Sequence, residues 1–474
     1  MIEINNEVKE YGQFYNDIVM AGSFISSHTN QRDIIAISKS TSFQQIESFL
    51  GSILFNRVPV IIPSQSKKVH REDFFEKIQK IEQAISPKFC ISDENDENIF
   101  TEFWPTVSKI NYSEKKEVPD TDIKETAFVQ LSSGTTGIPK IVKVSQKALI
   151  SHCDEYYNFI GLSNKSVIIS WLPLYHDMGL ISCFLLPVLK RISFVHINPF
   201  TWLLNPGLLF DKIEKYKGTH VWLPNFSFSL LSNIKTKSDL SSIKQIINCS
   251  EICNLEDMKN FVQKFSPNGI SETMIKTCYA LAENVFAVSQ SNSLSQFSGV
   301  MNCGKIIPGT SVIIVKGGKD VTEQCPGDIY IKSSYEPLSN EHTFYGYYKT
   351  GDIGFIKNGE LHVMGRSDDM IIIRGRNFYP YTIERDISMI DGVKAGRVAC
   401  FGVYCKETGT QEIVACFEDD GTRKENDIMV DILTMVSRKH DISICSKHVP
   451  AGWITKTSSG KINRKKCKER LNIK

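Results

Sequence analysis

The chain has 474 residues, of which 41% are hydrophobic, and this length allows roughly two to four compact units with cores of their own. Lys and Arg number 55 against 53 Asp and Glu, so the formal net charge is only +2. This balance argues against a protein that coats a polyanion, and we expect no nucleic-acid partner.

Helix-like and strand-like segments alternate through the first hundred residues. Apolar side chains at a spacing near 3.6 predict a helix over residues 43–55, and residues 58–62 are typical of a short buried strand. A charged, periodic segment at residues 71–84 predicts the next helix, and residues 89–91 predict the next strand. Together these segments predict βαβ units.

The later part of the chain changes character. Strands near residues 168–169, 246–247 and 312–315 stand beside helix-like segments and extend the α/β body. From Gly359 onward, short strands and one helix are separated by polar turns, which predicts a small α+β domain of about a hundred residues. The expected elements there are strands at residues 361–364 and 370–373, a helix at 382–389, and strands at 399–403 and 412–417.

The N-terminus and the cysteines bear on location. Residues 1–7 lack the basic and apolar regions of a signal peptide, and the most apolar stretch, residues 180–189, is interrupted by Pro187. We therefore expect neither secretion by that route nor a membrane span. The 13 cysteines include no CxxC pair, the closest pair being Cys249 and Cys253, which favours buried reduced thiols over zinc sites or disulfides. We therefore expect a chain of enzyme size in the reducing cytoplasm.

Hydroxyl side chains and glycines crowd one segment, which reads Ser132-Ser133-Gly134-Thr135-Thr136-Gly137-Ile138-Pro139-Lys140. Glycines let successive backbone N–H groups point at one anion, hydroxyls add donors, and the lysine supplies compensating charge. Such a loop suits a polyphosphate, although its spacing is not that of a P-loop. An ordinary surface hairpin rich in Ser, Thr and Gly is the alternative.

This segment resembles the signature of the adenylate-forming superfamily, which includes acyl-CoA synthetases, luciferases and peptide-synthetase adenylation domains. The core Ser-Gly-Thr-Thr-Gly-x-Pro-Lys is matched, with Ile141 where a glycine often follows. Further family motifs follow in the same order, so the resemblance covers almost the whole chain. It implies an α/β fold with a large multi-subdomain N-terminal domain, residues 1–366, that binds ATP and the acid. A small mobile α+β C-terminal domain, residues 367–474, would carry the catalytic lysine.

Two later segments resemble the family's adenine and magnesium motifs. Residues 279–283 match an aromatic-Gly-x-Thr-Glu motif, in which Tyr279 would stack on adenine and Glu283 would hold Mg²⁺ against phosphate oxygens. Ala282 replaces the common threonine, which removes one hydroxyl near the phosphates. Ser250 and Glu251 resemble the segment that borders the adenine. A core tyrosine and an ordinary strand end are the alternatives.

Three segments near the C-terminus complete the set. Asp352 ends a Tyr-Lys-Thr-Gly-Asp motif and would accept hydrogen bonds from both ribose hydroxyls. In residues 365–369, which resemble the family hinge, Arg366 would reach nucleotide oxygens and Asp368 would absorb the rotation. Lys461 lies in a segment that resembles the C-terminal lysine motif and would stabilise charge at the α-phosphate. A solvated turn and a solvated basic helix are the alternatives.

The substrate depends on residues 171–180, which resemble the fatty acyl-AMP ligase branch, as do residues 224–226, 239–242 and 375–380. His176 stands where amino-acid-activating domains place an aspartate, which favours a plain carboxylic acid, whereas Asp177 keeps an amino acid possible. Only residues 284–302 separate Glu283 from Cys303, so the segment associated with rejection of coenzyme A is missing or reduced.

The resemblance therefore implies a ligase that uses ATP and Mg²⁺ to convert a carboxylic acid, expected to be a fatty acid, into acyl-AMP. The acyl group would pass to a phosphopantetheine thiol of an acyl carrier protein, with coenzyme A as the second choice. A stand-alone amino-acid-activating enzyme and a nucleotide-binding regulator without turnover are the rivals. Catalytic roles fall to Lys461, Glu283, Thr136 and His176. Nucleotide contacts fall to Ser132, Ser133, Gly134, Thr135, Thr136, Lys140, Ser250, Glu251, Tyr279, Ala282, Asp352 and Arg366.

Overall fold

The computed structural model describes residues 1–65, 71–112, 115–120, 125–132, 140–321, 323–335, 343–373, 376–405, 410–456 and 461–471. The chain divides into two compact units. The first comprises Met1–Gln296, Asn302–Val312 and Ile331–Tyr348, and the second comprises Phe297–Met301, Ile313–Tyr330 and Lys349–Lys474. The boundary predicted at residue 366 marks where the small C-terminal domain would begin to rotate, and it stays a prediction.

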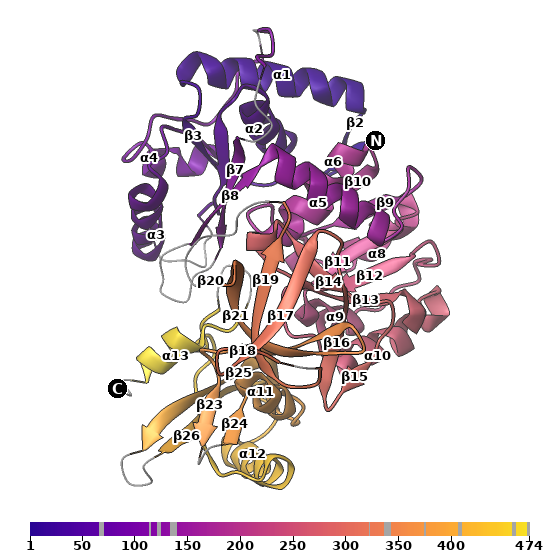
Figure 1. Ribbon diagram of the computed structural model, residues 1–474, viewed down its shortest axis with the longest axis vertical. Coiled ribbons are helices and arrows are strands. Elements are labelled where there is room, and N and C mark those ends of the chain that lie inside the picture. Colours follow the sequence, from indigo (N-terminus) through magenta and orange to yellow (C-terminus); the bar gives the residue numbers. More distant parts are fainter. Residues whose placement is uncertain are drawn as a thin grey trace. The chain divides into compact units, whose positions relative to one another are not determined.

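One sheet of the first unit has six strands in the order β6-β5-β3-β4-β7-β8, parallel apart from the antiparallel β7–β8 pair (Figure 1). Its strands are β3 (Ile34–Ser38), β4 (Val58–Ile61), β5 (Phe89–Ser92), β6 (Thr106–Val107), β7 (Thr126–Ser132) and β8 (Lys140–Ser145). The accompanying helices are α1 (Tyr11–His28), α2 (Phe43–Leu54), α3 (Arg71–Ile85), η1 (Glu94–Asp96) and α4 (Glu97–Phe100). The predicted βαβ units are confirmed, because their strands are buried on both faces and covered by amphipathic helices.

A second run of strands in this unit has the order β14-β13-β12-β11-β9-β10-β1-β2. It consists of β1 (Ile2–Ile4), β2 (Glu7–Lys9), β9 (Val167–Ser170), β10 (Ser193–His196), β11 (His220–Leu223), β12 (Gln245–Asn248), β13 (Ile275–Ala280) and β14 (Ala287–Gln290). The strands from β1 to β13 in this order are parallel, so their carboxyl ends share one edge. Its helices are α5 (Gln146–Phe159), η2 (Met178–Leu185), α6 (Leu186–Lys190), α7 (Pro199–Leu204), α8 (Leu208–Tyr216), α9 (Asn225–Ser232), α10 (Leu255–Phe265), η3 (Ser266–Asn268), η4 (Glu272–Met274) and η5 (Ala282–Asn284).

The apolar stretch at residues 180–189 is a buried core segment. It forms the π-helix η2 and the first part of α6, and every residue of η2 is buried. A helix that is apolar all round fits the interior of a large domain. In the part of the chain that the structure describes, no helix is both long and apolar enough to span a bilayer. All thirteen cysteines are free thiols, and most of them are buried.

Short strands and hairpins follow along the chain. They are β15 (Gln296–Phe297), β16 (Val300–Ile306), β17 (Thr310–Lys316), β18 (Lys319–Asp320), β19 (Gly327–Ser333), β20 (Thr343–Phe344), β21 (Tyr347–Lys357) and β22 (Glu360–Arg366). The antiparallel β21–β22 hairpin sets Asp352 opposite Arg366. This register places two predicted nucleotide-binding residues on adjacent strands of the second unit.

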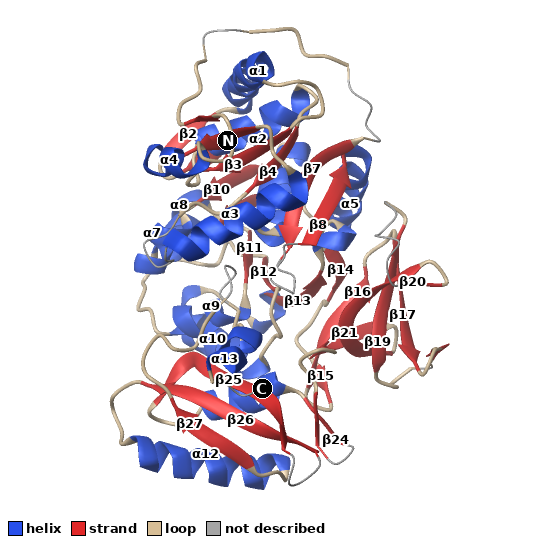
Figure 2. Ribbon diagram, turned by 90° about the vertical axis from the view of Figure 1, so that its left-hand side faces the viewer, coloured by secondary structure: helices blue, strands red, loops and turns tan. Residues whose placement is uncertain are grey.

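The rest of the second unit is the predicted small α+β fold. It contains β23 (Ile371–Ile373), β24 (Arg376–Phe378), α11 (Pro380–Ser388), β25 (Val393–Cys405), β26 (Thr410–Asp419), α12 (Glu425–His440), β27 (Ile444–His448) and α13 (Arg464–Arg470). The three-stranded sheet β25-β26-β27 separates two cores, since alternate side chains of β25 and β26 meet α11 and α12 on one face and α13 on the other. Figure 2 shows α12 and α13 on opposite sides of this sheet.

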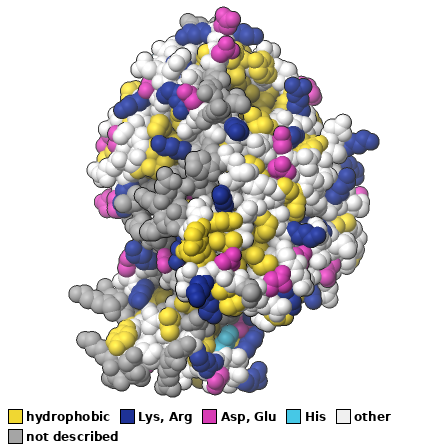
Figure 3. Space-filling model, in the orientation of Figure 1, with side chains coloured by type: hydrophobic (Ala, Val, Ile, Leu, Met, Phe, Trp, Pro, Cys, Tyr) yellow, Lys and Arg dark blue, Asp and Glu magenta, His cyan; other side chains and the backbone are white. Residues whose placement is uncertain are grey.

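The surface agrees with the even charge balance of the sequence. On the face drawn in Figure 3, basic and acidic side chains are interspersed, and neither sign forms a continuous field. That face therefore offers no single broad electrostatic patch to a polyanion.

Candidate active site

The two ends of the predicted phosphate segment lie side by side. Strand β7 ends at Ser132, β8 begins at Lys140, and these two residues are paired in the antiparallel register. The predicted residues Ser133, Gly134, Thr135 and Thr136 lie outside the described residues, as does the side chain of Ser132. The structure therefore describes the hairpin stem and the lysine at its end.

Lys140 meets two residues from distant parts of the first unit. Its Nζ lies 2.6 Å from Oε1 of Glu283 and also donates to the hydroxyl of Tyr348. The Tyr348 hydroxyl lies 3.1 Å from the same Glu283 oxygen, so the three groups form one cluster, which we call the Lys140 cluster. The phosphate-loop lysine and the predicted magnesium ligand thus come together, although 143 positions separate them in the sequence.

Both charged members of the Lys140 cluster are ionised. Burial favours the neutral form of each, but the ion pair outweighs it. The neighbouring carboxylate raises the pKa of Lys140, and the ammonium lowers the pKa of Glu283. An ammonium and a carboxylate therefore lie side by side. The ammonium can leave the carboxylate to bind phosphate oxygens, and the carboxylate can then bind a cation.

Glu283 is held in a strained turn. It lies in η5, which Leu281 separates from the end of β13, and Val285 two residues later has φ of 65°. A β-branched residue rarely adopts a positive φ, so the surroundings must fix this conformation. The N–H of Phe286 donates to the Asn284 carbonyl at 2.7 Å, and the Asn284 side chain donates to the Ala287 carbonyl at 2.7 Å. These bonds hold the turn that carries Glu283.

The predicted adenine-side residues lie at the carboxyl ends of two adjacent parallel strands, Ser250 just after β12 and Tyr279 within the last two residues of β13. Strands β12 and β13 pair in parallel with Asn248 opposite Thr277, so Ser250 and Tyr279, each two residues further on, lie near the same edge of the sheet. Tyr279 is only 9% exposed, and Ser250 has φ of 71°. The carboxylate of Glu251 accepts the N–H of Phe226 at 3.0 Å, which ties this turn to the start of α9.

A polar network holds the same turn. The side-chain oxygen of Asn225 accepts from the Asn248 amide and the Asn254 N–H, each at 2.9 Å, and its amide donates to Asp257 at 2.8 Å. The Ser250 hydroxyl lies 3.6 Å from the sulfur of Met178, the first residue of η2. The predicted adenine turn and the predicted acid-recognition segment are therefore neighbours.

The acid-recognition segment has a demanding backbone. A Cβ on Gly179 would lie 2.3 Å from the Pro173 carbonyl, so only glycine fits at this position. His176 is half-buried, and its ring lies edge-on to Tyr175 with centroids 4.6 Å apart. The carboxylate of Asp177 accepts the Met178 N–H at 2.9 Å, which caps η2. This cap gives Asp177 a structural role at the start of a π-helix, an element often found at functional sites.

The predicted ribose and hinge residues meet in the second unit. Nε of Arg366 lies 3.1 Å from Oδ1 of Asp352, and its Nη1 donates to the Thr350 carbonyl at 3.1 Å. The Thr350 hydroxyl donates to the Ile329 carbonyl at 2.9 Å and accepts the Asp352 N–H at 3.0 Å. Arg366 thereby holds the Asp352 carboxylate, and Thr350 holds its backbone N–H. Asp368 is exposed, in a turn immediately after β22.

The charged residues among the predicted set form two pairs in the described part of the chain, apart from the adenine-side turn and the acid-recognition segment. Lys140 and Glu283 meet in the first unit, where the sequence reasoning assigned no role to their partner Tyr348. Asp352 and Arg366 meet in the second unit, which also contains the exposed Lys461. Only the place of Tyr348 at the head of the motif that ends in Asp352 could have drawn attention to it.

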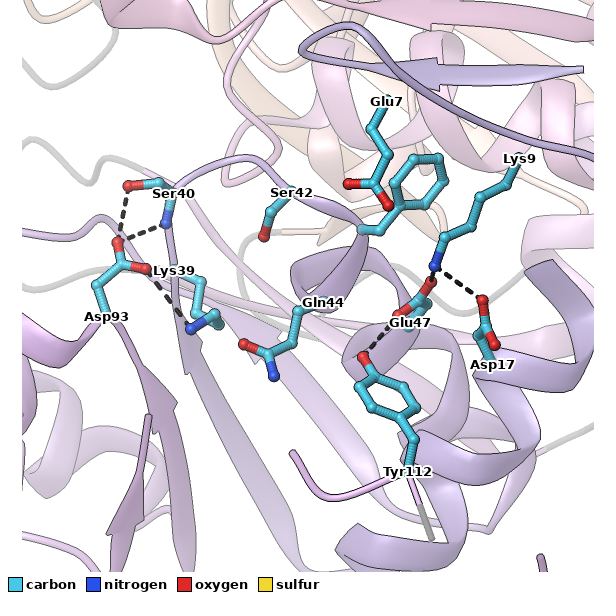
Figure 4. A pocket seen from close by; sticks show the side chains of 11 residues that line it. Glu7, Lys9, Asp17, Lys39, Ser40, Ser42, Gln44, Glu47, Asp93 and Tyr112 are labelled. Atoms are coloured by element: carbon cyan, nitrogen blue, oxygen red, sulfur yellow. Dashed lines mark hydrogen bonds and ion pairs between the residues drawn. The ribbon is translucent and has the colours of Figure 1, made fainter. Parts of the chain in front are cut away.

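A surface hollow of about 520 Å³ opens elsewhere in the first unit, and none of the predicted site residues lines it. Its lining consists of Glu7, Lys9, Asp17, Lys39, Ser40, Ser42, Phe43, Gln44, Glu47, Asp93 and Tyr112. Figure 4 shows Lys9 between Asp17 and Glu47, at 2.8 and 2.6 Å, with Tyr112 on the far side of Glu47. These charges satisfy one another, and they tie β2 to α1 and α2.

The donor set fits Mg²⁺ shared with a nucleotide. Among the described residues, no three His, Cys, Asp or Glu side chains are grouped so that they could hold a metal. A single ionised carboxylate, Glu283, stands beside the phosphate-loop lysine. Mg²⁺ is commonly bound by one or two carboxylates together with substrate phosphates, and Glu283 can supply such a ligand.

The comparisons with known proteins define the class. Residues 9–348 match the model of the AMP-binding enzyme family. The chain belongs to this family, and the resemblance read from its motifs is confirmed. It is an adenylate-forming ligase that uses ATP.

Individual relatives are more distant. The chain is 28% identical to the medium-chain-fatty-acid–[acyl-carrier-protein] ligase JamA of Moorena producens (strain JHB), covering 75% of this chain and 69% of that protein. It is 24% identical to a 4-hydroxyphenylalkanoate adenylyltransferase of Mycobacterium marinum, covering 98% and 86%. A structure from a study of fatty acyl-adenylate ligases from E. coli and L. pneumophila superposes with a TM-score of 0.90 at 21% identity, covering 99% and 95%. The predicted fold, with a large N-terminal and a small C-terminal part, is confirmed.

Proposed function

We propose that this ligase activates a fatty acid as its acyl-AMP and passes the acyl group to the phosphopantetheine thiol of an acyl carrier protein. The observation that carries this proposal is the Lys140 cluster, where a phosphate-loop ammonium and an ionised carboxylate meet at the end of a hairpin. The class of enzyme is the adenylate-forming ligase, and the proposal assigns its substrate class, its acceptor and the roles of particular residues.

In the first step, the triphosphate lies at the end of the β7–β8 hairpin, where Lys140 neutralises phosphate oxygens. Glu283 would hold Mg²⁺, and a bound Mg²⁺ would neutralise part of the negative charge of the phosphates. Tyr279 contacts the adenine, while the Asp352 carboxylate accepts hydrogen bonds from the ribose hydroxyls. These contacts orient the α-phosphate for attack.

The reaction itself is an in-line displacement. A carboxylate oxygen of the acid forms a bond to the α-phosphorus, the bond to the bridging oxygen breaks, and pyrophosphate leaves. Lys461 places an ammonium beside the crowded oxygens and stabilises charge that is greatest in the transition state. The chain contributes positioning and electrostatics, and the product is the mixed anhydride.

In the second step, the small C-terminal part rotates about Asp368 and withdraws Lys461. The pantetheine thiol gives up its proton to solvent water, its sulfur bonds to the acyl carbon, and AMP leaves with the electrons of the anhydride bond. Gly375 and the side chain of Asn377, which the family resemblance places near the thiol route, lie outside the described residues. Arg376 is described and pairs with Asp441 at 3.0 Å.

Two observations support a plain acid over an amino acid. The Asp177 carboxylate is engaged at the start of η2, which leaves it less suited to pair with a substrate ammonium. The similarity to a medium-chain-fatty-acid–[acyl-carrier-protein] ligase points to a fatty acid and a carrier protein. The similarity to a 4-hydroxyphenylalkanoate adenylyltransferase makes aryl-substituted acids the second class to test. The free cysteines support a reducing location, and we place the reaction in the cytoplasm.

The test is acid-dependent exchange of labelled pyrophosphate into ATP over fatty, aryl-alkanoic and amino acids, followed by thioester formation with coenzyme A and with a phosphopantetheinylated carrier protein. We expect exchange with fatty acids and thioester formation mainly on the carrier. Pyrophosphate exchange driven only by amino acids would show that the substrate is an amino acid and not a fatty acid. Faster transfer to coenzyme A would replace the acceptor, and ATP binding without exchange for any acid would favour a regulator.

A further inference from the structure

Arg464, three residues beyond Lys461, forms ion pairs with two carboxylates. Its Nε and Nη2 donate to the two carboxylate oxygens of Glu384, at 2.7 and 2.6 Å. Its Nη1 donates to Oδ2 of Asp369 at 2.7 Å. The side chain of Arg464 is 20% exposed and that of Glu384 only 7%, so this contact is largely withdrawn from solvent.

The three residues come from three different elements. Glu384 lies on α11, Arg464 begins α13, and Asp369 directly follows Asp368, the predicted pivot. Oε1 of Glu384 also accepts the backbone N–H of Cys400 at 2.8 Å, which anchors it to β25. The arginine therefore connects the lysine segment to the first residue beyond the pivot and to the core of the small fold. We call these three residues the Arg464 cluster.

The other end of the lysine segment is fixed as well. The N–H of Ile454 donates to Glu418 at 2.9 Å, and its carbonyl accepts from Arg397 at 2.9 Å. Asn463 donates its N–H to the Thr455 carbonyl at 2.9 Å, and Lys456 forms a β-bridge with Ile462. Lys461 thus projects from a stem that is held on both sides.

We propose that Arg464, held by Glu384 and Asp369, is a positioning residue that fixes Lys461 relative to the pivot at Asp368. A guanidinium fork that binds two carboxylates has one geometry, so Lys461 moves with the strand that leaves the hinge as one body. A rotation at Asp368 then moves the Lys461 ammonium by the same rotation. This inference rests on the proposed role of Lys461 in adenylate formation.

The test compares the two half-reactions in Arg464→Lys, Arg464→Ala and Glu384→Gln. A misplaced ammonium should slow pyrophosphate exchange about tenfold in Arg464→Lys and about 100-fold in Arg464→Ala. Thiol transfer from supplied synthetic acyl-AMP needs no Lys461, so it should stay within about twofold of the unsubstituted protein. Arg438→Lys, at an exposed arginine on α12, is the matched control and should change neither half-reaction.

A double-substitution cycle separates positioning from folding. If Arg464 acts through Lys461, Arg464→Lys should add less than about twofold to the defect of Lys461→Ala in residual acyl-adenylate formation. The inference would be overturned if the defects of Arg464→Lys and Lys461→Ala multiplied in the double variant. It would also be overturned if a variant with unchanged circular dichroism lost both half-reactions equally. Should Arg464→Ala fail to fold, Arg464→Lys and Glu384→Gln carry the test. Absence of exchange in the unsubstituted protein would instead overturn the proposed function.

Discussion

The Lys140 cluster and the Arg464 cluster use the same two kinds of charge in different ways. In the first, one ammonium on a flexible stem contacts a carboxylate and a hydroxyl, and the lysine side chain is 36% exposed. In the second, a planar guanidinium makes three hydrogen bonds to two carboxylates and is 20% exposed. Lysine is a point charge that can change partners, whereas the arginine fork fixes geometry.

The comparison teaches that a cation's contacts indicate whether it responds to a ligand or holds the fold. Lys140 can leave Glu283 for phosphate oxygens while the carboxylate takes a metal ion. Arg464 would break a bidentate pair if it moved, and nothing in the proposed reaction repays that loss. The experiments that follow probe this difference, beginning with the largest expected effect.

Lys461→Ala should have the largest effect because it removes the ammonium proposed to stabilise the transition state. We expect acid-dependent pyrophosphate exchange to fall about 1000-fold. Both clusters stay intact in this variant, so its thermal midpoint should match that of the unsubstituted protein. Exchange at the original rate would refute the lysine assignment and show that Lys140 suffices.

Glu283→Gln should break the Lys140 cluster at its acidic member. We expect exchange to fall about 30-fold and the Mg²⁺ concentration needed for half-maximal rate to rise, since a neutral amide is a poorer ligand. A titration of rate against Mg²⁺ measures both. Glu272→Gln, at an exposed glutamate nearby in sequence, is the control. An unchanged Mg²⁺ requirement would remove Glu283 from the metal site.

Tyr348→Phe should have a smaller effect, because it removes one hydroxyl and keeps the ring. The lost hydrogen bond to the Lys140–Glu283 pair should raise the KM for ATP about fivefold. Steady-state kinetics with saturating acid test this expectation. Tyr347→Phe, at the preceding and more exposed tyrosine, is the matched control. A similar KM change in both variants would mean that Tyr348 does not orient the pair.

The acid dependence of stability should show the smallest effect. The folded-state pKa of Glu283 is depressed, because the attraction of Lys140 outweighs burial. Its stabilising contribution is therefore present above the unfolded value of 4.5 and is lost as the pH falls through the lower folded value. Thermal midpoints from pH 7 to pH 3 should converge for the unsubstituted protein and Glu283→Gln at the acid end. A constant difference would contradict the ion pair.

The sequence predicted the local elements well where their pattern was strong. Residues 43–55 and 71–84 form helices, and residues 58–62 and 89–91 contain strands, within a residue or two of the expected bounds. The strained turn at Val285 was not predictable, since a β-branched residue gives no local signal for a positive φ. The capping role of Asp177 was equally hidden, because the same aspartate also fits recognition of an amino acid.

By itself, the sequence determined the order of the motifs, the chemistry that each can perform and the alternation of elements, because these depend on residues close together in the chain. The tertiary structure decided which charges meet. Strand register and helix packing bring Lys140 into contact with Glu283 and Tyr348. They also bring Arg464 into contact with Glu384 and Asp369. Such contacts join residues scores of positions apart, and no local pattern fixes them, because they follow from how the sheets are ordered and covered.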